Sequence, residues 1–244
     1  MWRITVLIAS AAIGASTITA PAPVCTSNKE IAGTSGSHDA FAANDHNPDQ
    51  IFGLDTEPVT EGRLLDKWLR IEADITKELK IIAQCQASKP CPAPAQMLME
   101  LSLEGVNRSW RARVGLINRA VDLAISPMSD ETQWGVADHW SDPFETLHST
   151  LGDCEDYAIV KYAALRAAGF PKTSVRLIVL RNRFPNEDHA VAAVWVDNQW
   201  LILDNRTLTL VRDTDAPSGN CTMTKYAPWS SCGRKPEGVL AARK

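Results

Sequence analysis

The chain has 244 residues and a formal net charge of -4, with 45% hydrophobic and 22% charged residues. This apolar content is enough for one substantial core, so one catalytic domain is expected. The negative charge and the absence of a long basic run exclude nucleic acid as an expected partner, because phosphates require clustered Lys and Arg.

Residues 1–22 have the pattern of a secretory signal peptide. Arg3 supplies a positive start, residues 4–18 are almost uncharged and apolar, and small residues such as Ala20 follow. We therefore expect export. Lipid attachment at Cys25 is the weaker alternative because the preceding residues make a poor lipobox. An uncleaved anchor is another, although an apolar stretch of fewer than ~20 residues is short for a bilayer.

The next segments change from polar to helical. Residues 23–60 are rich in Ser, Gly, Asn, Asp, Thr and Pro and lack periodicity, which predicts a flexible polar linker. From residue 62 to Cys85, apolar side chains recur at helical spacing and predict the first core helix. Further helices are expected at residues 95–103 and 109–125.

The second half of the chain predicts a loop, a helix and strands. Residues 126–152 contain several Pro and Gly and predict a long loop, and loops of that length are often functional. A helix is expected from Cys154 to about Ala168, ended by Gly169. Three strands follow, at residues 174–181, 190–196 and 199–204. The domain then spans residues 61–215, followed by a C-terminal tail at 216–244.

Cysteine usage agrees with export. Two pairs could close local disulfide loops, namely Cys85 with Cys91 and Cys221 with Cys232. Cys25 lies in the N-terminal region, so Cys154 remains as the single unpaired thiol. Nucleophilic catalysis is one reason for such a thiol in an exported protein. A buried inert cysteine is the alternative, but Cys154 does not lie in an apolar run.

The local sequence around Cys154 suits a nucleophile. Asp153 is a suitable N-cap, which puts Cys154 in the first turn of a helix. There the unpaired backbone N–H groups and the helix dipole favour a thiolate and lower its pKa. The same amides could receive an oxyanion during acyl transfer.

The strands allow a geometric test of the partners of this thiol. Asp197-Asn198 predicts a two-residue hairpin turn, in which His189 faces Arg206 and Asp204 is its diagonal neighbour. Diagonal Cβ atoms lie within ~8 Å, close enough for a carboxylate to reach an imidazole. A three-residue loop would destroy this parity, whereas a four-residue loop would keep it.

The predicted roles follow from these positions. Cys154 is the nucleophile, His189 the general base and then acid, and Asp204 the group that fixes the imidazole tautomer. Alternative bases are His139 and His148 in the predicted loop. The second oxyanion donor stays open among Gln133, Trp134, Trp140 and Asn118.

Several segments carry a resemblance to a known family. They are Asp138-His139-Trp140-Ser141-Asp142-Pro143, Gly152-Asp153-Cys154-Glu155-Asp156-Tyr157-Ala158, His189 and Leu203-Asp204-Asn205. Over roughly residues 105–210 the chain resembles the bacterial transglutaminase-like cysteine proteases, and within these the LapG-type periplasmic proteases. The resemblance implies an α+β, papain-like or transglutaminase-like fold, in which N-terminal helices pack with a C-terminal antiparallel sheet. It also implies that Cys154, His189 and Asp204 form the catalytic triad.

The same resemblance implies a biological role. Such proteases cleave a large surface adhesin near its N-terminus, typically at a pair of alanines, which releases the adhesin and disperses biofilm. An inner-membrane receptor that senses cyclic di-GMP inhibits them. The polar arm and the extra cysteine pairs of this chain depart from the simpler family pattern.

Calcium is suggested by the resemblance and by a physical argument. Asp153, Glu155 and Asp156 crowd negative charge around Cys154, and each like charge raises the pKa of the thiol. A hard cation bound by these carboxylates would cancel this effect, and Asp188 could supply a further oxygen ligand. The alternative is that the acids point to solvent and only cap the helix.

Two other function classes stay open. The same triad could serve a transglutaminase or amidase that transfers an acyl group without proteolysis. Alternatively, the chain could be a non-catalytic periplasmic binding module with a vestigial thiol.

Overall fold

The computed structural model describes residues 2–7, 47–52, 54–55, 61–85, 91–183, 186–215 and 239–241. The helices are α1 (Arg63–Cys85), α2 (Ala93–Leu103), α3 (Trp110–Ala124), α4 (Asp130–Trp134), α5 (Pro143–Ser149) and α6 (Cys154–Ala167), with a 3-10 turn at Lys172–Ser174. The strands are β1 (Trp2–Leu7), β2 (Gln50–Ile51), β3 (Leu54–Asp55), β4 (Ser126–Pro127), β5 (Leu151–Gly152), β6 (Val175–Arg183), β7 (Asn186–Val196), β8 (Gln199–Leu203), β9 (Val211–Arg212) and β10 (Val239–Ala241).

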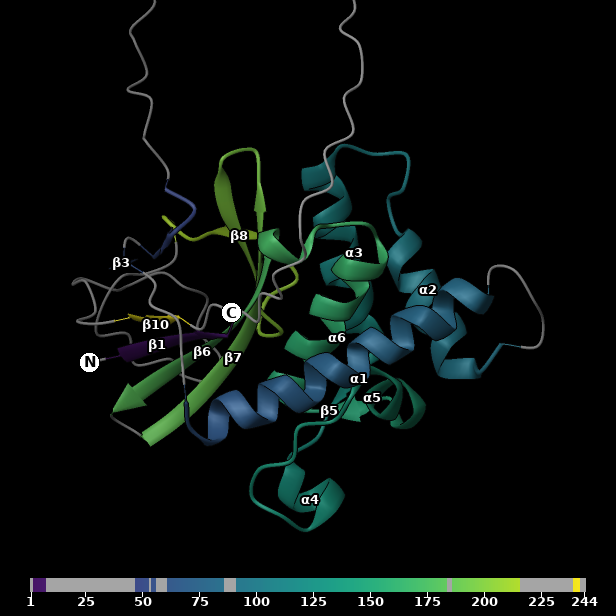
Figure 1. The fold of residues 1–244 in the computed structure, drawn as a ribbon, viewed down its shortest axis with the longest axis horizontal. Coiled ribbons are helices and arrows are strands. Elements are labelled where there is room, and N and C mark those ends of the chain that lie inside the picture. Colours follow the sequence, from purple (N-terminus) through teal and green to yellow (C-terminus); the bar gives the residue numbers. More distant parts are fainter. Residues whose placement is uncertain are drawn as a thin grey trace, which may run out of the picture.

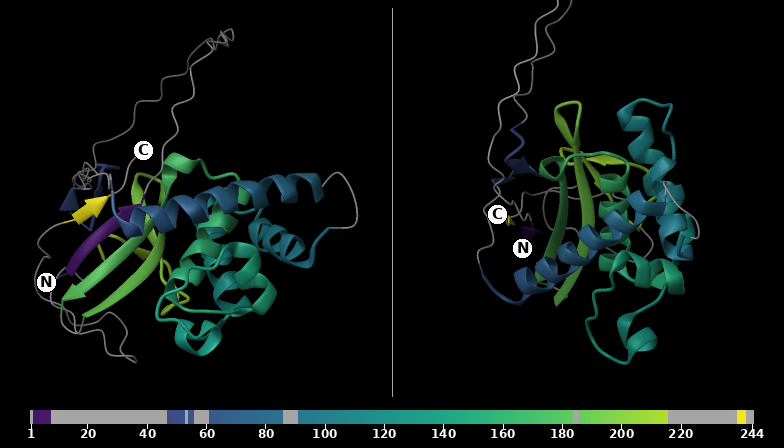
Figure 2. Two further views of the ribbon diagram at one scale, coloured as in Figure 1. Left: turned by 60° about the horizontal axis from the view of Figure 1, so that its bottom comes forward. Right: turned by 45° about the vertical axis from the view of Figure 1, so that its right-hand side comes forward.

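The architecture is a sheet with the helices gathered on one of its faces (Figures 1 and 2). The sheet order is β10-β1-β6-β7-β8-β9, and its neighbours are antiparallel except for the parallel pair β1 and β10. Helices and strands are therefore segregated rather than alternating, which confirms the predicted α+β class of N-terminal helices packed with an antiparallel sheet.

Helix α6 is the centre of the domain. All of its residues from Glu155 to Leu165 are buried, because β6 and β7 cover one side and α1, α2, α3 and α5 pack around the others. Trp68 of α1 meets Tyr162 of α6 edge to face, with ring centroids 5.0 Å apart. A helix surrounded in this way has no solvent face, so its polar residues must find partners inside the protein.

The first three predicted helices are confirmed to within two residues at each end. In α1 the apolar side chains at helical spacing, among them Trp68, Ile71 and Ile75, form its buried face. The predicted Cys85–Cys91 disulfide is present and links the end of α1 to the start of α2. Cys25, Cys221 and Cys232 lie outside the described residues.

The predicted hairpin register is also confirmed. Asp197 and Asn198 have φ values of 51° and 58°, as a two-residue hairpin turn with two left-handed residues requires. Val196 pairs with Gln199, and the ladder continues to the pair Ala192 and Leu203.

The prediction of one long loop at residues 126–152 is wrong, because this segment contains the two short helices α4 and α5. The side chain of Ser129 accepts a hydrogen bond from the backbone of Thr132 at the start of α4. At α5, Asp142 accepts from the backbone of Glu145, and Pro143 occupies the first turn. Helices of one or two turns are too short to show the periodic apolar spacing of a helix. The capping residues were therefore the only sequence signal for α4 and α5.

Part of the predicted flexible linker is ordered. Residues 47–52 lie on the face of the sheet opposite the helices, where Ile51 is fully buried. The carbonyl of Pro48 accepts hydrogen bonds from the Arg176 guanidinium at 2.8 Å and from the Trp200 indole at 3.3 Å. The guanidinium also lies over the Trp200 ring. A few apolar residues in this polar segment are therefore enough to cover part of the face of the sheet opposite the helices.

The first strand falls within the predicted signal peptide. β1 pairs with β6 along Trp2–Leu7. Removal of that segment would leave β6 without this neighbour. In the described part of the chain, no helix combines the length and the apolar character needed to cross a membrane.

The buried Glu78 of α1 makes the stability of this fold depend on pH. Burial and the neighbouring Asp142 raise the pKa of Glu78 from its ordinary value of 4.5 to about 9. The unfolded chain therefore releases this proton at lower pH than the folded chain, so stability falls as pH rises from 4.5 towards 9. The backbone N–H of Phe144 donates to Glu78 Oε1, a contact that a glutamine would keep.

We expect Glu78→Gln to melt at a higher temperature than the wild type at pH 8, with a gain of roughly 1 kcal/mol or more in unfolding free energy. The difference should vanish near pH 4, where Glu78 is protonated in both states. Thermal unfolding of the two proteins at pH 4, 6 and 8 measures it. A pH-independent difference would contradict the prediction.

Candidate active site

A cleft of about 670 Å³ opens beside the N-terminus of α6. It lies between the start of α1, the segment that connects α4 to α5, and the strands β6 and β7. Its lining residues are Glu61, Gly62, Arg63, Leu64, Lys67, Asp130, Ala137, Asp138, Trp140, Asp153, Cys154, Glu155, Val179, Asp188, His189 and Ala190. Two of the three predicted catalytic residues, Cys154 and His189, therefore share one cavity.

Cys154 is the first residue of α6, with Asp153 as the N-cap, as predicted. The backbone N–H of Asp153 donates to Asp156 Oδ2 at 3.3 Å, which closes the first turn. A Cβ atom at Gly152 would lie 2.7 Å from this carboxylate oxygen, so a larger residue would displace it. The glycine and the acid in the sequence motif are thus required by the turn that presents the thiol.

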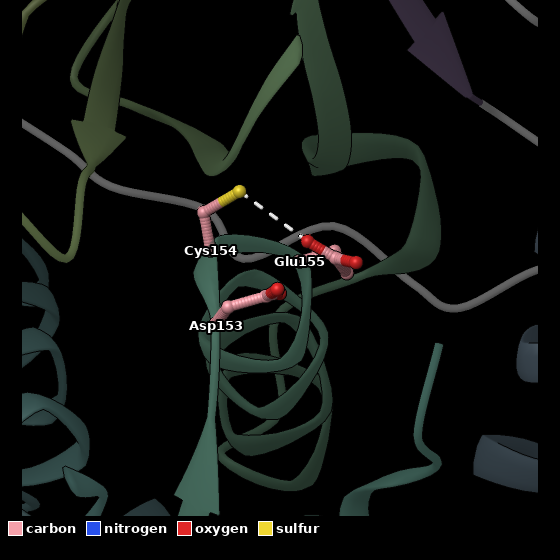
Figure 3. Close-up of side chains that lie close together, drawn as sticks. All are labelled: Asp153, Cys154 and Glu155. Atoms are coloured by element: carbon pink, nitrogen blue, oxygen red, sulfur yellow. Dashed lines mark hydrogen bonds between the residues drawn. The ribbon is translucent and has the colours of Figure 1, made fainter. Parts of the chain in front are cut away.

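The thiol lies at the point where the β7–β8 ladder ends. Beyond the pair Ala192 and Leu203 the backbone of β7 has no β8 partner. Here the N–H of Ala190 donates to Cys154 Sγ at 3.5 Å. On its other side the thiol donates to Glu155 Oε2 at 3.3 Å, as the dashed line in Figure 3 shows.

His189 and Asp204 form a buried pair, and each is 1% exposed. His189 Nε2 and Asp204 Oδ1 lie 2.9 Å apart, and the same oxygen accepts from the backbone N–H of Arg206 at 3.0 Å. Burial acts to raise the pKa of Asp204, but the charge and hydrogen bond of His189, together with the backbone hydrogen bond and charge of Arg206, outweigh burial and lower it. The carboxylate is therefore ionised. His189 Nδ1 makes no hydrogen bond within the described chain, which leaves this nitrogen for proton transfer.

The predicted lowering of the thiol pKa by the helix start is opposed by the surroundings. Burial raises the pKa of the Cys154 thiol well above its ordinary value, and the negative charges of Glu155 and Asp153 raise it further. The hydrogen bond from Ala190 acts in the opposite direction but does not compensate. As it stands, the site holds a protonated thiol.

The acidic residues near the thiol are more numerous than predicted. Among the described residues, Cys154 Sγ and one oxygen each of Asp153 and Glu155 lie within 4.8 Å of one another, and two further groups, which overlap at Asp130, consist of carboxylates alone. One contains Asp130, Asp153 and Asp156, and the other contains Asp130, Asp138 and Glu155. We call these five residues the carboxylate cluster. The predicted fourth ligand, Asp188, lines the cleft but belongs to neither group.

The chemistry of the carboxylate cluster fits a hard divalent cation. Burial and Asp153 raise the pKa of Glu155 to about 10. Burial raises that of Asp156 to about 7, against hydrogen bonds from Ser141 and Asp153. Oδ1 of Asp130 and Oδ1 of Asp153 are buried without a hydrogen-bond partner. Crowded oxygen ligands with unused lone pairs are what Ca²⁺ takes up in proteins.

Asp130 and Asp138 were not among the predicted candidate ligands because they fall in the segment predicted to be a loop. Asp130 opens α4, and its carboxylate accepts from the backbone N–H of His139, which folds the segment back on itself. Asp138 is also in an ion pair with Lys67 of α1. The Asp138-His139-Trp140 motif was the one sequence signal that could have indicated Asp138. The motif alone did not show that this segment lies close to Cys154 in the fold.

The alternative bases and oxyanion donors separate by position. His139 contacts Glu145, and His148 lies on α5, and neither lines the cleft. Of the four possible oxyanion donors, Trp140 alone is among the cleft-lining residues. Gln133 donates to Ser149, Asn118 donates to Thr207, and Trp134 packs against His139.

Comparisons with known proteins were made with the sequence and the structure. The sequence matches the family described as bacterial transglutaminase-like cysteine proteinases over residues 80–219. A comparison with curated proteins gave no match. Among solved structures, LapG of Legionella pneumophila matches at 23% identity with a TM-score of 0.41, covering 57% of this chain and 76% of that one. Its calcium-bound form matches at 22% identity with a TM-score of 0.40 and the same coverage.

The geometry predicts that His189 controls the reactivity of Cys154. We expect His189→Ala to slow alkylation of the native thiol by iodoacetamide at pH 7.5 by about ten-fold or more, because the thiol loses its proton acceptor. The rate of loss of free thiol measures it. His148→Ala is the matched control and should react like the wild type. Equal rates for wild type and His189→Ala would contradict the assignment.

Proposed function

Because the chain belongs to the bacterial transglutaminase-like cysteine proteinases, we propose that it is a periplasmic endopeptidase that uses Cys154, His189 and Asp204 on a large surface adhesin. The observation that carries the triad is the arrangement at the end of the β7–β8 ladder. There Cys154 contacts the backbone of Ala190, the residue after His189, and His189 contacts the buried carboxylate of Asp204, which is the set of groups that nucleophilic hydrolysis needs.

The proposed reaction uses the two ring nitrogens of His189 in different roles. His189 Nε2–H donates to Asp204, so Nδ1 is the basic nitrogen and accepts the proton of Cys154. The thiolate attacks the scissile carbonyl carbon, and backbone N–H groups at the start of α6 stabilise the oxyanion. His189 then gives its proton to the leaving amine, which yields a thioester. Water adds after His189 removes its proton, and the acid product leaves as the thiol is restored.

The carboxylate cluster would hold Ca²⁺ through Asp130, Asp138, Asp153, Glu155 and Asp156. A bound Ca²⁺ supplies positive charge that offsets these carboxylates and so favours the thiolate of Cys154. The support for this proposal is the crowding of the oxygens and the two unpartnered buried oxygens of Asp130 and Asp153. The protein's own part is to hold the acids in place through α4 and the first turn of α6.

The proposed biology follows from the sequence resemblance. Cleavage near the N-terminus of a surface adhesin would release it from the cell and disperse biofilm. An inner-membrane receptor that senses cyclic di-GMP would hold the enzyme inactive. Export is supported by the apolar, positively started residues 1–22 and by the Cys85–Cys91 disulfide, which suits an oxidising compartment.

Incubation with the N-terminal region of a large surface adhesin from the same cell tests the proposal. We expect the wild type to cut this fragment into two defined products, and Cys154→Ala to lose at least about 10³-fold in rate. Gel analysis with mass spectrometry of the new ends measures both. Cleavage by Cys154→Ala at the wild-type rate would contradict the assignment.

The same assay, run with a primary amine present, separates proteolysis from acyl transfer. The peptidase gives free acid ends, whereas a transglutaminase would attach the amine to a glutamine side chain. Amine incorporation without chain cleavage would overturn the proposed peptidase activity in favour of acyl transfer.

Calcium binding should be visible without any substrate. We expect Ca²⁺ in large excess over its Kd to raise the melting temperature of the wild type by about 5 °C or more relative to EGTA, because the ion binds the folded state only. Thermal unfolding with and without Ca²⁺ measures the shift.

Matched variants identify the ligands. Asp130→Asn and Asp153→Asn should lose most of this shift, whereas Asp188→Asn should keep it, because Asp188 lies outside the carboxylate cluster. An unchanged melting temperature of the wild type in Ca²⁺ would remove the metal from the proposal.

A further inference from the structure

A buried ion pair lies two helical turns along α6 from the catalytic thiol. Lys161 of α6 and Asp122 of α3 have side chains that are 0% and 4% exposed, and Lys161 Nζ lies 2.6 Å from Asp122 Oδ1. Two turns of helix place Lys161 about 10 Å from Cys154 along the helix axis. Burial of a lysine is costly, so a lysine at this depth calls for an explanation beyond packing.

The ion pair lies close enough to the Asp204 carboxylate for their charges to interact. On α3, one turn before Asp122, Asn118 donates to the carbonyl of Thr207, which fixes the chain directly after Asp204 against this helix. Asp204 Oδ1 serves His189 and the Arg206 backbone, whereas Oδ2 is buried without a hydrogen-bond partner. The second oxygen of Asp204 thus lacks a compensating donor.

The charges of these residues act on one another. Burial lowers the pKa of Lys161, while the negative charges of Asp122 and Asp204 oppose this by raising it. Burial likewise raises the pKa of Asp122 to about 6, Lys161 lowers it, and Asp204 adds to the increase. When all three are ionised, the charges of Asp122, Lys161 and Asp204 therefore alternate in sign.

We propose that Lys161, held in place by Asp122, is a positioning residue whose buried ammonium keeps Asp204 ionised and oriented towards His189. The inference rests on the proposed roles of His189 and Asp204. A neutral Asp204 would donate its proton to His189 Nε2 instead of accepting one. The imidazole would then carry its proton on Nδ1 and could not accept the proton of Cys154.

The double variant Asp122→Asn with Lys161→Met tests this without leaving a buried charge unpaired, which could unfold the protein. We expect its kcat on the adhesin fragment to fall by about ten-fold or more with KM within about two-fold, because the loss concerns proton transfer and not substrate binding. The control is Glu72→Gln with Lys172→Met, which removes an ion pair of 2.5 Å between α1 and the 3-10 turn. The control should keep the wild-type kcat.

Asp204→Asn supplies the background for a double-mutant cycle. If Lys161 acts through Asp204, the double variant should lower kcat by less than about two-fold further once Asp204→Asn is present. Equal fold losses in both backgrounds would show that the pair only maintains the fold and would overturn the proposal.

The tautomer of His189 gives a readout that needs no substrate. Nitrogen-15 NMR should show the wild-type ring protonated on Nε2 and the Asp122→Asn, Lys161→Met variant shifted towards protonation on Nδ1. An unchanged tautomer in a folded variant would also overturn the inference. If the wild type cleaves nothing but the variant shows the expected shift of the His189 tautomer, the proposed substrate fails and the positioning role stands.

Discussion

The site depends on the docking of the first turn of α6 at the point where the β7–β8 ladder ends. The N–H of Ala190, which a longer β8 would use, is instead donated to Cys154 Sγ. The same end of the ladder lets the chain turn away after Leu203, so that Asp204 reaches His189 from a neighbouring strand.

This docking requires α6 to pass through the middle of the protein, and burial then sets the electrostatics at both ends of the site. At the N-terminus, burial raises the pKa values of Cys154, Glu155 and Asp156 together. Two turns later it buries Lys161, which requires Asp122 as a partner. Charges that are costly to bury occur on the same helix as Cys154, and that helix has no exposed face to carry them.

The sequence predicted what depends on local rules. Helical spacing located α1, the two-residue turn fixed the β7–β8 register, and that register paired His189 with Asp204. What failed depends on contacts between distant segments. Ile51 is an isolated apolar residue in a polar stretch, and only the far face of the sheet makes it core. Asp130 joins the carboxylate cluster because the segment after α4 folds back onto it. That segment shows no periodic apolar pattern from which this contact could be predicted.

A helix N-terminus alone does not explain the reactivity expected of Cys154. The dipole is equivalent to about half a positive charge at the first turn, and it acts over that turn only. Against it stand several carboxyl groups with oxygens within 4.8 Å of one another, each of which carries a full charge when ionised. Burial is the largest cause of the raised pKa of the thiol, and the charges of Glu155 and Asp153 add to it, so the helix N-terminus does not compensate. Protons on Glu155 and Asp156, or a divalent cation among the same oxygens, are two ways to offset one excess of negative charge. If protons neutralise the acids, the thiol stays hydrogen-bonded to a neutral carboxyl group. A bound cation also contributes the positive electrostatic potential that stabilises a thiolate.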